Sequence, residues 1–480
     1  MVLAYNVKDK PTFGKLIVFA FQQILAIMAA TIAVPSIIRH DMSHAAALFG
    51  AGMGTIIYLL FTKFTSPVFL GSSFAFLGSM GAAFAGGVSM SLGYLGMIIG
   101  ATFAGLVYVV IAIIVKFAGV KWISKLMPAV VIGPTVAIIG LSLAGNAIGD
   151  LFEGGNLVEV IIPIIKDGAI AYDKIDVPTA NTYIALACGL VTLFTTIIVS
   201  VYGKKMLKLI PFIIGICAGY LFASIFTLFG IWFNNPELVV IDFSQFEKMH
   251  WYPEFTFITA FSGNYGFGEV GNMGAYIATI AVAYIPVAFV VFAEHIADHK
   301  NLSTIINKDL LTDPGLSRTL LGDGVGSMVG AFFGGCPNTT YGESVGCVAI
   351  TKNASVYTIL TAAILCILIS FVAPFMTFLA TIPSCVMGGV CVALYGFIAV
   401  SGLKMIQKVD LGQNKNLFVV SVILIAGIGG MSLTFGSITI TPVACALILG
   451  IITNLIVSKA KEEKTEENSQ QEQDNTKEVA

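Results

Sequence analysis

The sequence predicts an all-α polytopic membrane protein with fourteen transmembrane segments arranged as a 7+7 inverted repeat. Of its 480 residues, 57% are hydrophobic and only 11% are charged, whereas soluble domains carry about 25% charged residues. A spanning helix needs about 20 apolar residues, and motifs that recur in the two halves indicate the repeat. The stretches free of Asp, Glu, Lys and Arg are 64–115, 126–149, 177–203, 209–236, 270–293, 353–403 and 416–458.

Hydropathy and loop charge set the expected spans. With the N-terminus in the cytoplasm, all but four of the 25 Lys and Arg residues lie on the cytoplasmic side, as the positive-inside rule requires. The first span is too long for the apolar region of a cleavable signal peptide. The predicted spans are 14–38, 44–62, 68–88, 92–115, 126–148, 180–202, 209–233, 273–297, 323–336, 341–351, 355–377, 381–402, 416–433 and 437–458.

These spans divide the chain into five parts, which we expect in the cytoplasmic membrane with both termini inside the cell. The parts are a cytoplasmic N-terminus (1–13), a first seven-span repeat (14–235), an extracytoplasmic loop (236–272), a second, inverted seven-span repeat (273–458) and a tail (459–480). The tail is polar and nearly free of bulky apolar residues, which predicts a disordered cytoplasmic segment.

Two pairs of motifs connect the halves. MPAVVIG (127–133) in the fifth span matches IPSCVMG (382–388) in the twelfth, with Pro and Gly at the same spacing. LGSSFAF (70–76) in the third span corresponds in position to NTTYGES (338–344) in the tenth. Because each half has an odd number of spans, seven, the second half crosses the membrane in the opposite orientation to the first. Paired, interrupted segments in an inverted repeat indicate the binding site of a transporter near the bilayer midplane.

The interrupted segments predict two short strands that cross near the membrane centre. Non-helical backbone at membrane depth must be buried in protein or line a cavity. Residues 72–76 alternate small and aromatic side chains, and residues 339–342 are their expected partner. The half-helices that follow would aim free N–H groups at the crossing point. Such a site suits a small planar ligand with both hydrogen-bond donors and acceptors.

Acidic residues lie close to these segments. Glu294 and Asp298 share one helix face in FAEHIADH (292–299), and His295 and His299 share the neighbouring face. Glu343 is the one acid of the tenth span. Charged groups inside a membrane are costly and usually functional. The bland alternatives are a helix end that meets water for Asp298 and His299, and a structural hydrogen bond within a broken helix for Glu343.

Glu294 and Glu343 come from opposite halves and are expected to converge on one cavity with few cations nearby. Burial and mutual repulsion favour the protonated form of at least one carboxyl. A protonated carboxyl can couple proton movement to the binding of a neutral solute, whereas an ionised one accepts hydrogen bonds from ligand N–H groups. The candidates for proton coupling are Glu294, His295, Asp298 and Glu343.

Other functions lack the residues they need. An anion carrier of this architecture would want a cation at the crossing strands, where the chain offers Glu343. A membrane enzyme would need a nucleophile with a base or a metal motif, and none is present. His295 and His299 adjoin no thiolate, and the eight cysteines lie in apolar runs without a CxxC pair, so no metal is predicted. The net charge of −2 carries no information about nucleic acid, and because the sequence has no basic stripe, no nucleic-acid partner is predicted. A channel mode stays open.

At these motifs the chain resembles the nucleobase–ascorbate transporter family (nucleobase:cation symporter-2), and within it the bacterial uracil permeases. The likeness runs through nearly the whole chain. It is strongest in LGSSFAF (70–76), AEHIADH (293–299), KDLLTDPGLSRTLLGDGVGSMVGAFFGGCPNTTYGESVGCVAITK (308–352) and IPSCVMGGVCVALYGFIAVSG (382–402). The resemblance implies core and gate domains and a proton symporter that imports uracil or a related nucleobase by alternating access. It also implies a homodimer, with the proton as coupling ion and no cofactor.

The resemblance also assigns site residues, position by position. Glu294 and Glu343 would bond the uracil ring, Phe74 and Gly342 would offer backbone groups, and Ala30, Tyr341 and Tyr395 would form apolar walls. Three departures stand out: Ser344 replaces an Asn of the family signature, Gln22 and Gln23 replace a Gln-His pair, and Asp298 stands where uracil-type members carry His. Asp298 is typical of purine-type members, so xanthine or another purine remains the alternative substrate.

Overall fold

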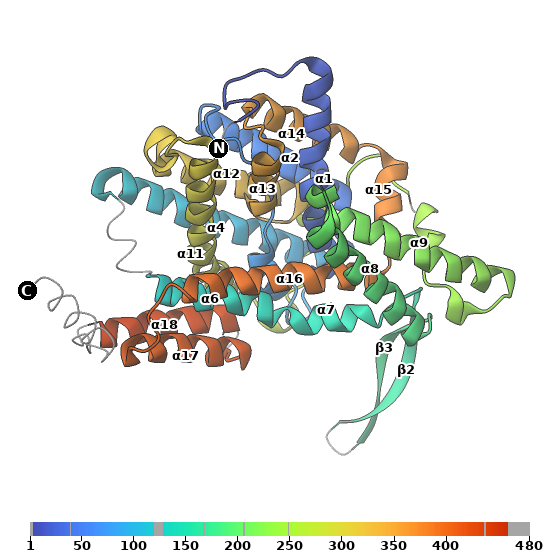
Figure 1. Ribbon diagram of the computed structural model, residues 1–480. Helices are drawn as coiled ribbons and strands as arrows, with labels where there is room; N and C mark the ends of the chain where they lie inside the picture. Colours follow the sequence, from blue (N-terminus) through green and yellow to red (C-terminus); the bar gives the residue numbers. More distant parts are fainter. Residues whose placement is uncertain are drawn as a thin grey trace, which may run out of the picture.

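The computed structural model describes residues 3–38, 40–119, 128–166, 169–204, 207–247, 249–435 and 438–458, and within them the chain is a mostly helical membrane protein (Figure 1). Eight of its helical segments are long and apolar enough to cross a membrane. They are α1 (Phe13–Ile38), α2 (His44–Phe61), α4 (Met90–Ala118), α6 with α7 (Ala129–Ser142, Ala144–Leu151), α8 (Thr182–Tyr202), α9 (Pro211–Trp232), α11 (Met273–Ile306) and α16 (Ser384–Ile406). The predicted tail lies outside the described residues.

The other six predicted spans fall on segments that are shorter, bent, interrupted or, in the case of α12 (Leu316–Gly334), less apolar. α14 (Val356–Ser370) and α15 (Ala373–Ala380) meet at 84° and make at most a ninth apolar span. The helices at the other five of these spans are α3 (Leu77–Ala83), α12, α13 (Gly342–Thr351), α17 (Asn414–Ile428) and α18 (Pro442–Val457). The number fourteen therefore stays a prediction, while a helical protein with eight to nine apolar spans is what the structure establishes.

Two strands cross between the halves, as predicted. β1 (Leu70–Ser72) pairs antiparallel with β4 (Asn338–Thr340), in the register Leu70–Thr340, Gly71–Thr339 and Ser72–Asn338. The predicted strand bounds were wrong, because residues 74–76 form the 3-10 helix η1 and α13 already begins at Gly342. Each strand is three residues long, so its backbone groups pair at the crossing and the half-helix starts at once.

Glycine seams hold together helices from opposite halves. A Cβ atom on Gly54 of α2 would stand 2.8 Å from the carbonyl oxygen of Gly326 on α12, and one on Gly140 of α6 would stand 2.3 Å from the carbonyl oxygen of Tyr395 on α16. Only glycine permits such an approach, which is a common way for membrane helices to pack. α2 and α12 are the predicted second and ninth spans, and α6 and α16 are the predicted fifth and twelfth spans. Corresponding spans of the two predicted repeats therefore contact one another.

α11 is longer than the predicted span: it ends at Ile306, nine residues beyond the expected end at 297. His299 is only 1% exposed, so a helix end that meets water was the wrong alternative for this residue. The imidazoles of His295 and His299 stay inside the protein because their partners lie on α12 and α2. The polar residues around His295 and His299 therefore indicate a polar protein interior at this end of the predicted span, and not a contact with water.

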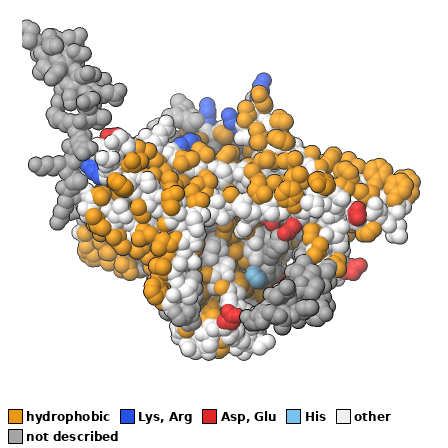
Figure 2. All heavy atoms as spheres, turned by 90° about the horizontal axis from the view of Figure 1, so that it is seen from below, with side chains coloured by type: hydrophobic (Ala, Val, Ile, Leu, Met, Phe, Trp, Pro, Cys, Tyr) orange, Lys and Arg blue, Asp and Glu red, His pale blue; other side chains and the backbone are white. Residues whose placement is uncertain are grey.

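The molecular surface is that of a membrane protein. Large hydrophobic side chains cover much of the face in Figure 2, where Lys and Arg gather along one edge and most Asp and Glu lie away from it. Part of the predicted loop 149–179 is a hairpin of β2 (Leu157–Lys166) and β3 (Ala169–Pro178), which projects from the helices (Figure 1). The short pair β5 (Leu433–Phe435) and β6 (Ile438–Ile440) connects α17 and α18.

Candidate functional site

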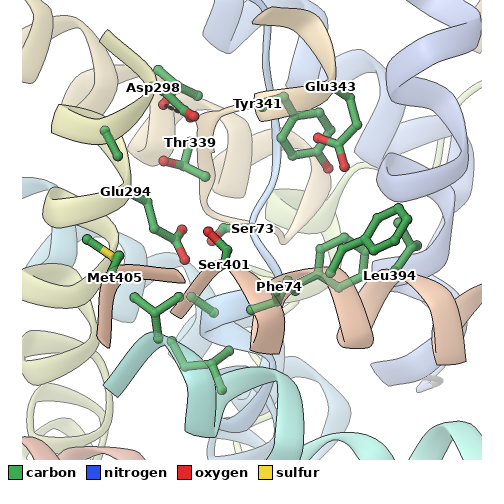
Figure 3. A pocket seen from close by; sticks show the side chains of 18 of the residues that line it. Ser73, Phe74, Glu294, Asp298, Thr339, Tyr341, Glu343, Leu394, Ser401 and Met405 are labelled. Carbon is green, nitrogen blue, oxygen red and sulfur yellow. Dashed lines mark hydrogen bonds between the residues drawn. The ribbon is translucent and has the colours of Figure 1, made fainter. Parts of the chain in front are cut away.

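A cavity of about 430 Å³ lies beside the crossing strands (Figure 3). One wall carries the polar groups, which come from α11, from β4 and the start of α13, and from the segment between β1 and η1. Its residues are Ser73, Phe74, Ala75, Glu294, Ala297, Asp298, Thr339, Thr340, Tyr341, Gly342 and Glu343. The structure thus brings together at one cavity five of the residues predicted to bind substrate, Phe74, Glu294, Tyr341, Gly342 and Glu343, and adds Asp298.

The two acids on α11 have different environments. Asp298 accepts a hydrogen bond through Oδ2 from Thr340 Oγ1 at 2.9 Å, so it is tied to the end of β4. Glu294 has no side-chain hydrogen bond or ion pair among the described residues, although it lines the same cavity one turn earlier. Asp298 is thus partly satisfied by the protein, whereas the Glu294 carboxyl is left for water or a ligand.

Glu343 stands in the first turn of α13, at the broken helix. The N-cap residue Tyr341 makes no side-chain cap to this helix, so the N–H groups of its first turn remain available, with the positive end of the helix dipole. The Tyr341 hydroxyl instead donates to the carbonyl oxygen of Ser72 at 2.7 Å, which locks the turn after β4 against β1. The site therefore offers a carboxyl and free backbone N–H groups side by side.

The opposite wall is almost entirely apolar, and sequence reasoning missed it. Val136 and Ile139 of α6, Phe212 of α9 and one stripe of α16 form this wall. The stripe on α16 is Leu394, Phe397, Ile398, Ser401 and Met405, and its helical spacing was the available signal. A flat ligand would bond to the polar wall and pack one face against the apolar one, as in many small-molecule sites.

Three predicted site residues do not line the cavity. Ala30 is 2% exposed within α1, and Tyr395 is buried, with its ring centroid 6.0 Å from that of Phe74. His295 faces away into α12, with Nδ1 2.6 Å from Asp323 Oδ2. Asp323, fully buried, is not among the predicted site residues, because the predicted span begins at this residue, whereas α12 already begins at Leu316.

Among the described residues, those that line the cavity include carboxylates and hydroxyls but no Lys, Arg or His. Within the described part of the chain, no group of three His, Cys, Asp or Glu side chains is arranged to hold a metal ion. The cavity can therefore accept hydrogen bonds from ligand N–H groups, donate from backbone N–H and threonine hydroxyls, and hold protons on its acids. It has no fixed side-chain cation for an anionic ligand.

The sequence comparisons with known proteins all match permeases. Residues 14–435 match the family model Xan_ur_permease, whose description reads "Permease family". The chain is 38% identical over 470 residues to the uracil permease of Bacillus caldolyticus, covering 96% of this chain and 97% of the relative. It is 35% identical to that of Bacillus subtilis (strain 168), covering 97% and 98%, and 32% identical to that of Escherichia coli (strain K12), covering 94% of each.

Solved structures support the fold alone. The transmembrane domain of the cyanobacterial bicarbonate transporter BicA matches with a TM-score of 0.58 at 13% identity, covering 94% of this chain and 100% of that one. The murine anion transporter Slc26a9 matches with a TM-score of 0.61 at 13% identity, covering 94% of this chain and 69% of that one. At such low sequence identity, the likeness supports a shared fold and says nothing about the substrate.

Proposed function

The chain belongs to the xanthine/uracil permease family, so it is a membrane permease and not an enzyme, and from this premise we propose that it imports uracil by proton symport. The observation that carries the proposal is the cavity at the crossing strands, where carboxyls from α11 and α13 face an apolar wall. Uracil permeases of 32–38% identity over nearly the whole chain support the choice of substrate.

Uracil fits this chemistry group by group. Its two ring N–H groups need acceptors, which Glu294 and Glu343 supply, and its two carbonyl oxygens need donors, which the start of α13 and the strand backbone supply. Its flat faces are apolar enough to pack against the stripe on α16. A buried acceptor that meets an N–H stabilises the complex, whereas an analogue lacking that N–H leaves the carboxyl unpaired.

Proton coupling follows from the same acids. Glu294, Asp298 and Glu343 share one cavity without a side-chain cation, and like charges at such a site cannot all stay ionised. A neutral ligand adds no charge, so a proton taken up with it relieves the repulsion in the loaded carrier. The transport cycle would then carry one nucleobase with at least one proton down the proton gradient.

In this proposal the chain forms two inverted repeats of seven spans each, which are divided between a core domain and a gate domain. The core contributes the crossing strands, α11 and α13, and the gate contributes α6, α9 and α16, so relative motion of the two would open the cavity to each side in turn. The seams between corresponding helices and the strand pair between the halves support this arrangement. Both termini are cytoplasmic in this proposal, and the carrier is a homodimer.

A purine nucleobase is the second candidate, since Asp298 lies at the cavity where the resemblance gives uracil-type carriers a histidine. A cavity of about 430 Å³ is within the usual range of small-molecule sites, about 300–1,000 Å³, and has room for either ring system. An anion is disfavoured by the three carboxyls and the absence of a lysine or arginine from the lining.

Uptake in cells that lack their own uracil carrier tests the proposal. Radiolabelled uracil should enter with saturation, and unlabelled uracil should compete better than xanthine. A protonophore should abolish accumulation, while replacing sodium with choline should leave it unchanged. Preferential competition by xanthine would reassign the substrate, and sensitivity to sodium without sensitivity to the protonophore would refute proton coupling. The quaternary state follows from the mass of the detergent-solubilised protein.

A further inference from the structure

Two stacked imidazoles lie buried behind the polar wall of the cavity. His295 and His299 of α11 are 0% and 1% exposed, their ring centroids are 4.0 Å apart and their planes meet at 29°. Neither residue lines the cavity. Buried polar groups are normally hydrogen-bonded, and these two find their partners on different helices.

α12 holds the first imidazole through both of its nitrogens. His295 Nδ1 lies 2.6 Å from Asp323 Oδ2, and Nε2 lies 3.0 Å from Thr319 Oγ1. Asp323 Oδ2 also lies 3.5 Å from the hydroxyl oxygen of Thr339, on β4. His295 is therefore connected through Asp323 to one of the two crossing strands, directly beside the residue that Asp298 holds, Thr340.

α2 holds the second imidazole. His299 Nδ1 lies 2.7 Å from the backbone oxygen of His295, which can only accept, so Nδ1 carries a hydrogen and the other nitrogen is left for Tyr58. That nitrogen, Nε2, lies 2.6 Å from the Tyr58 hydroxyl, which is 2.7 Å from Ser66 Oγ in the segment leading to β1. One turn before Tyr58, Thr55 Oγ1 bonds the backbone N (2.9 Å) and O (3.2 Å) of Leu70, where β1 begins.

The stack thus ties α11 to the supports of both strands. Glu294 precedes His295 directly, and Asp298 precedes His299 directly, so any rotation or slide of this part of α11 would move both acids and break both imidazole contacts. Sites that bind precisely depend on side chains whose own positions are locked by such surrounding contacts. A ligand held between α11 and the strands needs their spacing to be set before it arrives.

We propose that His295 and His299 are positioning residues, which set the distance between the acids of α11 and the crossing strands. The inference rests on the proposed function and deepens it. His295, predicted from sequence to take part in proton coupling, acts on transport through geometry in this proposal. The titratable groups that face the stack are Asp323 of α12, Tyr58 of α2, Tyr108 of α4, and Glu294 and Asp298 of α11 itself.

Matched substitutions test the proposal in uracil uptake, with the amount of carrier in the membrane measured alongside. His299→Leu removes the contact to Tyr58, and we expect a KM about tenfold higher, the loss that follows when a buried polar partner is left unpaired. His299→Gln returns a polar nitrogen near the Nε2 position and should keep KM within about threefold. His295→Asn and His295→Leu form the corresponding pair for Asp323. Asn301→Leu, exposed on the same helix, should leave KM unchanged.

The outcomes separate positioning from the other roles. An unchanged KM in both leucine variants, with only less carrier in the membrane, would make the stack a structural support and overturn the proposal. A flattened dependence of uptake on pH in His295→Asn would make His295 a proton carrier and also overturn it. Tyr58→Phe combined with His299→Leu should raise KM by less than the product of the two single effects, because both variants remove the contact between Tyr58 and His299. If the unsubstituted protein neither takes up nor binds any nucleobase, the proposed function and this inference are both overturned. If the unsubstituted protein is active and the histidine variants have an unchanged KM, the inference alone is overturned.

Discussion

Replacement of Glu343 by Gln removes one carboxyl from the cavity and hardly changes its shape. Glu343 lines the cavity in the first turn of α13, and its side chain has no ion pair or side-chain partner among the described residues. The acceptor capacity of its carboxylate is therefore available to the ligand. Gln keeps one oxygen but presents an NH₂ group, which cannot accept a hydrogen bond from a ring N–H.

The size of the effect follows from that contact. A hydrogen bond to a charged group contributes about 1.5–3 kcal/mol, and about 1.4 kcal/mol corresponds to a factor of ten in affinity. The KM of Glu343→Gln for uracil should therefore rise by about 10-fold to 150-fold. Glu294→Gln should show a similar rise, since its carboxyl also lines the cavity and has no hydrogen-bond or ion-pair partner in the part of the chain that the structure describes.

The assay is initial-rate uptake of radiolabelled uracil over a range of concentrations, normalised to carrier in the membrane. Glu237→Gln is the control, because Glu237 lies exposed in η3 (Pro236–Leu238), away from the cavity. The control should match the parent. A KM within about threefold of the parent for both Glu294→Gln and Glu343→Gln, at equal abundance, would refute the assignment of these acids to the ligand.

Three further predictions concern single contacts. Asp298→Asn should weaken the dependence of uptake on pH, because it removes a titrating group from the cavity; an unaltered pH profile and KM would return Asp298 to a structural role. Gly54→Ala should lower the melting temperature of the purified protein, since overpacking costs about 1–3 kcal/mol and its Cβ would meet the seam with α12. Gly145→Ala, with open space around it, is the control and should not lower it. Ser344→Ala should also reduce thermal stability, by about 1–3 kcal/mol, because Ser344 Oγ accepts from the buried N–H of Phe69 at 3.0 Å; an unchanged melting temperature would show that the N–H finds another partner.

The sequence predicted the features that depend on local pattern. Apolar runs located the helices, and the broken motifs at 70–76 and 338–344 located the strand pair. The acids Glu294 and Glu343 stood out because a charge within an apolar run needs a reason. These features are visible from composition and spacing within one segment, without knowledge of how segments pack.

Features that depend on packing between segments were not predictable in the same way. The stripe on α16 that faces the cavity looks like any other apolar face until α6 and α9 are placed beside it. The predicted ninth span began only at Asp323, yet α12 begins at Leu316 and buries Asp323 against His295. The extension of α11 to Ile306 has the same cause, since its polar residues find partners on helices distant in sequence.

The strand pair has a consequence for biosynthesis. β1 emerges from the ribosome with the first half of the chain, but the hydrogen-bond partners of its backbone lie on β4, in the second half. Until that later segment is inserted, a stretch of extended backbone must wait in the bilayer with open polar groups, which lipid cannot satisfy. We therefore expect the first half alone to be unstable in the membrane, and a split version of this gene to yield stable protein only when both fragments are expressed together.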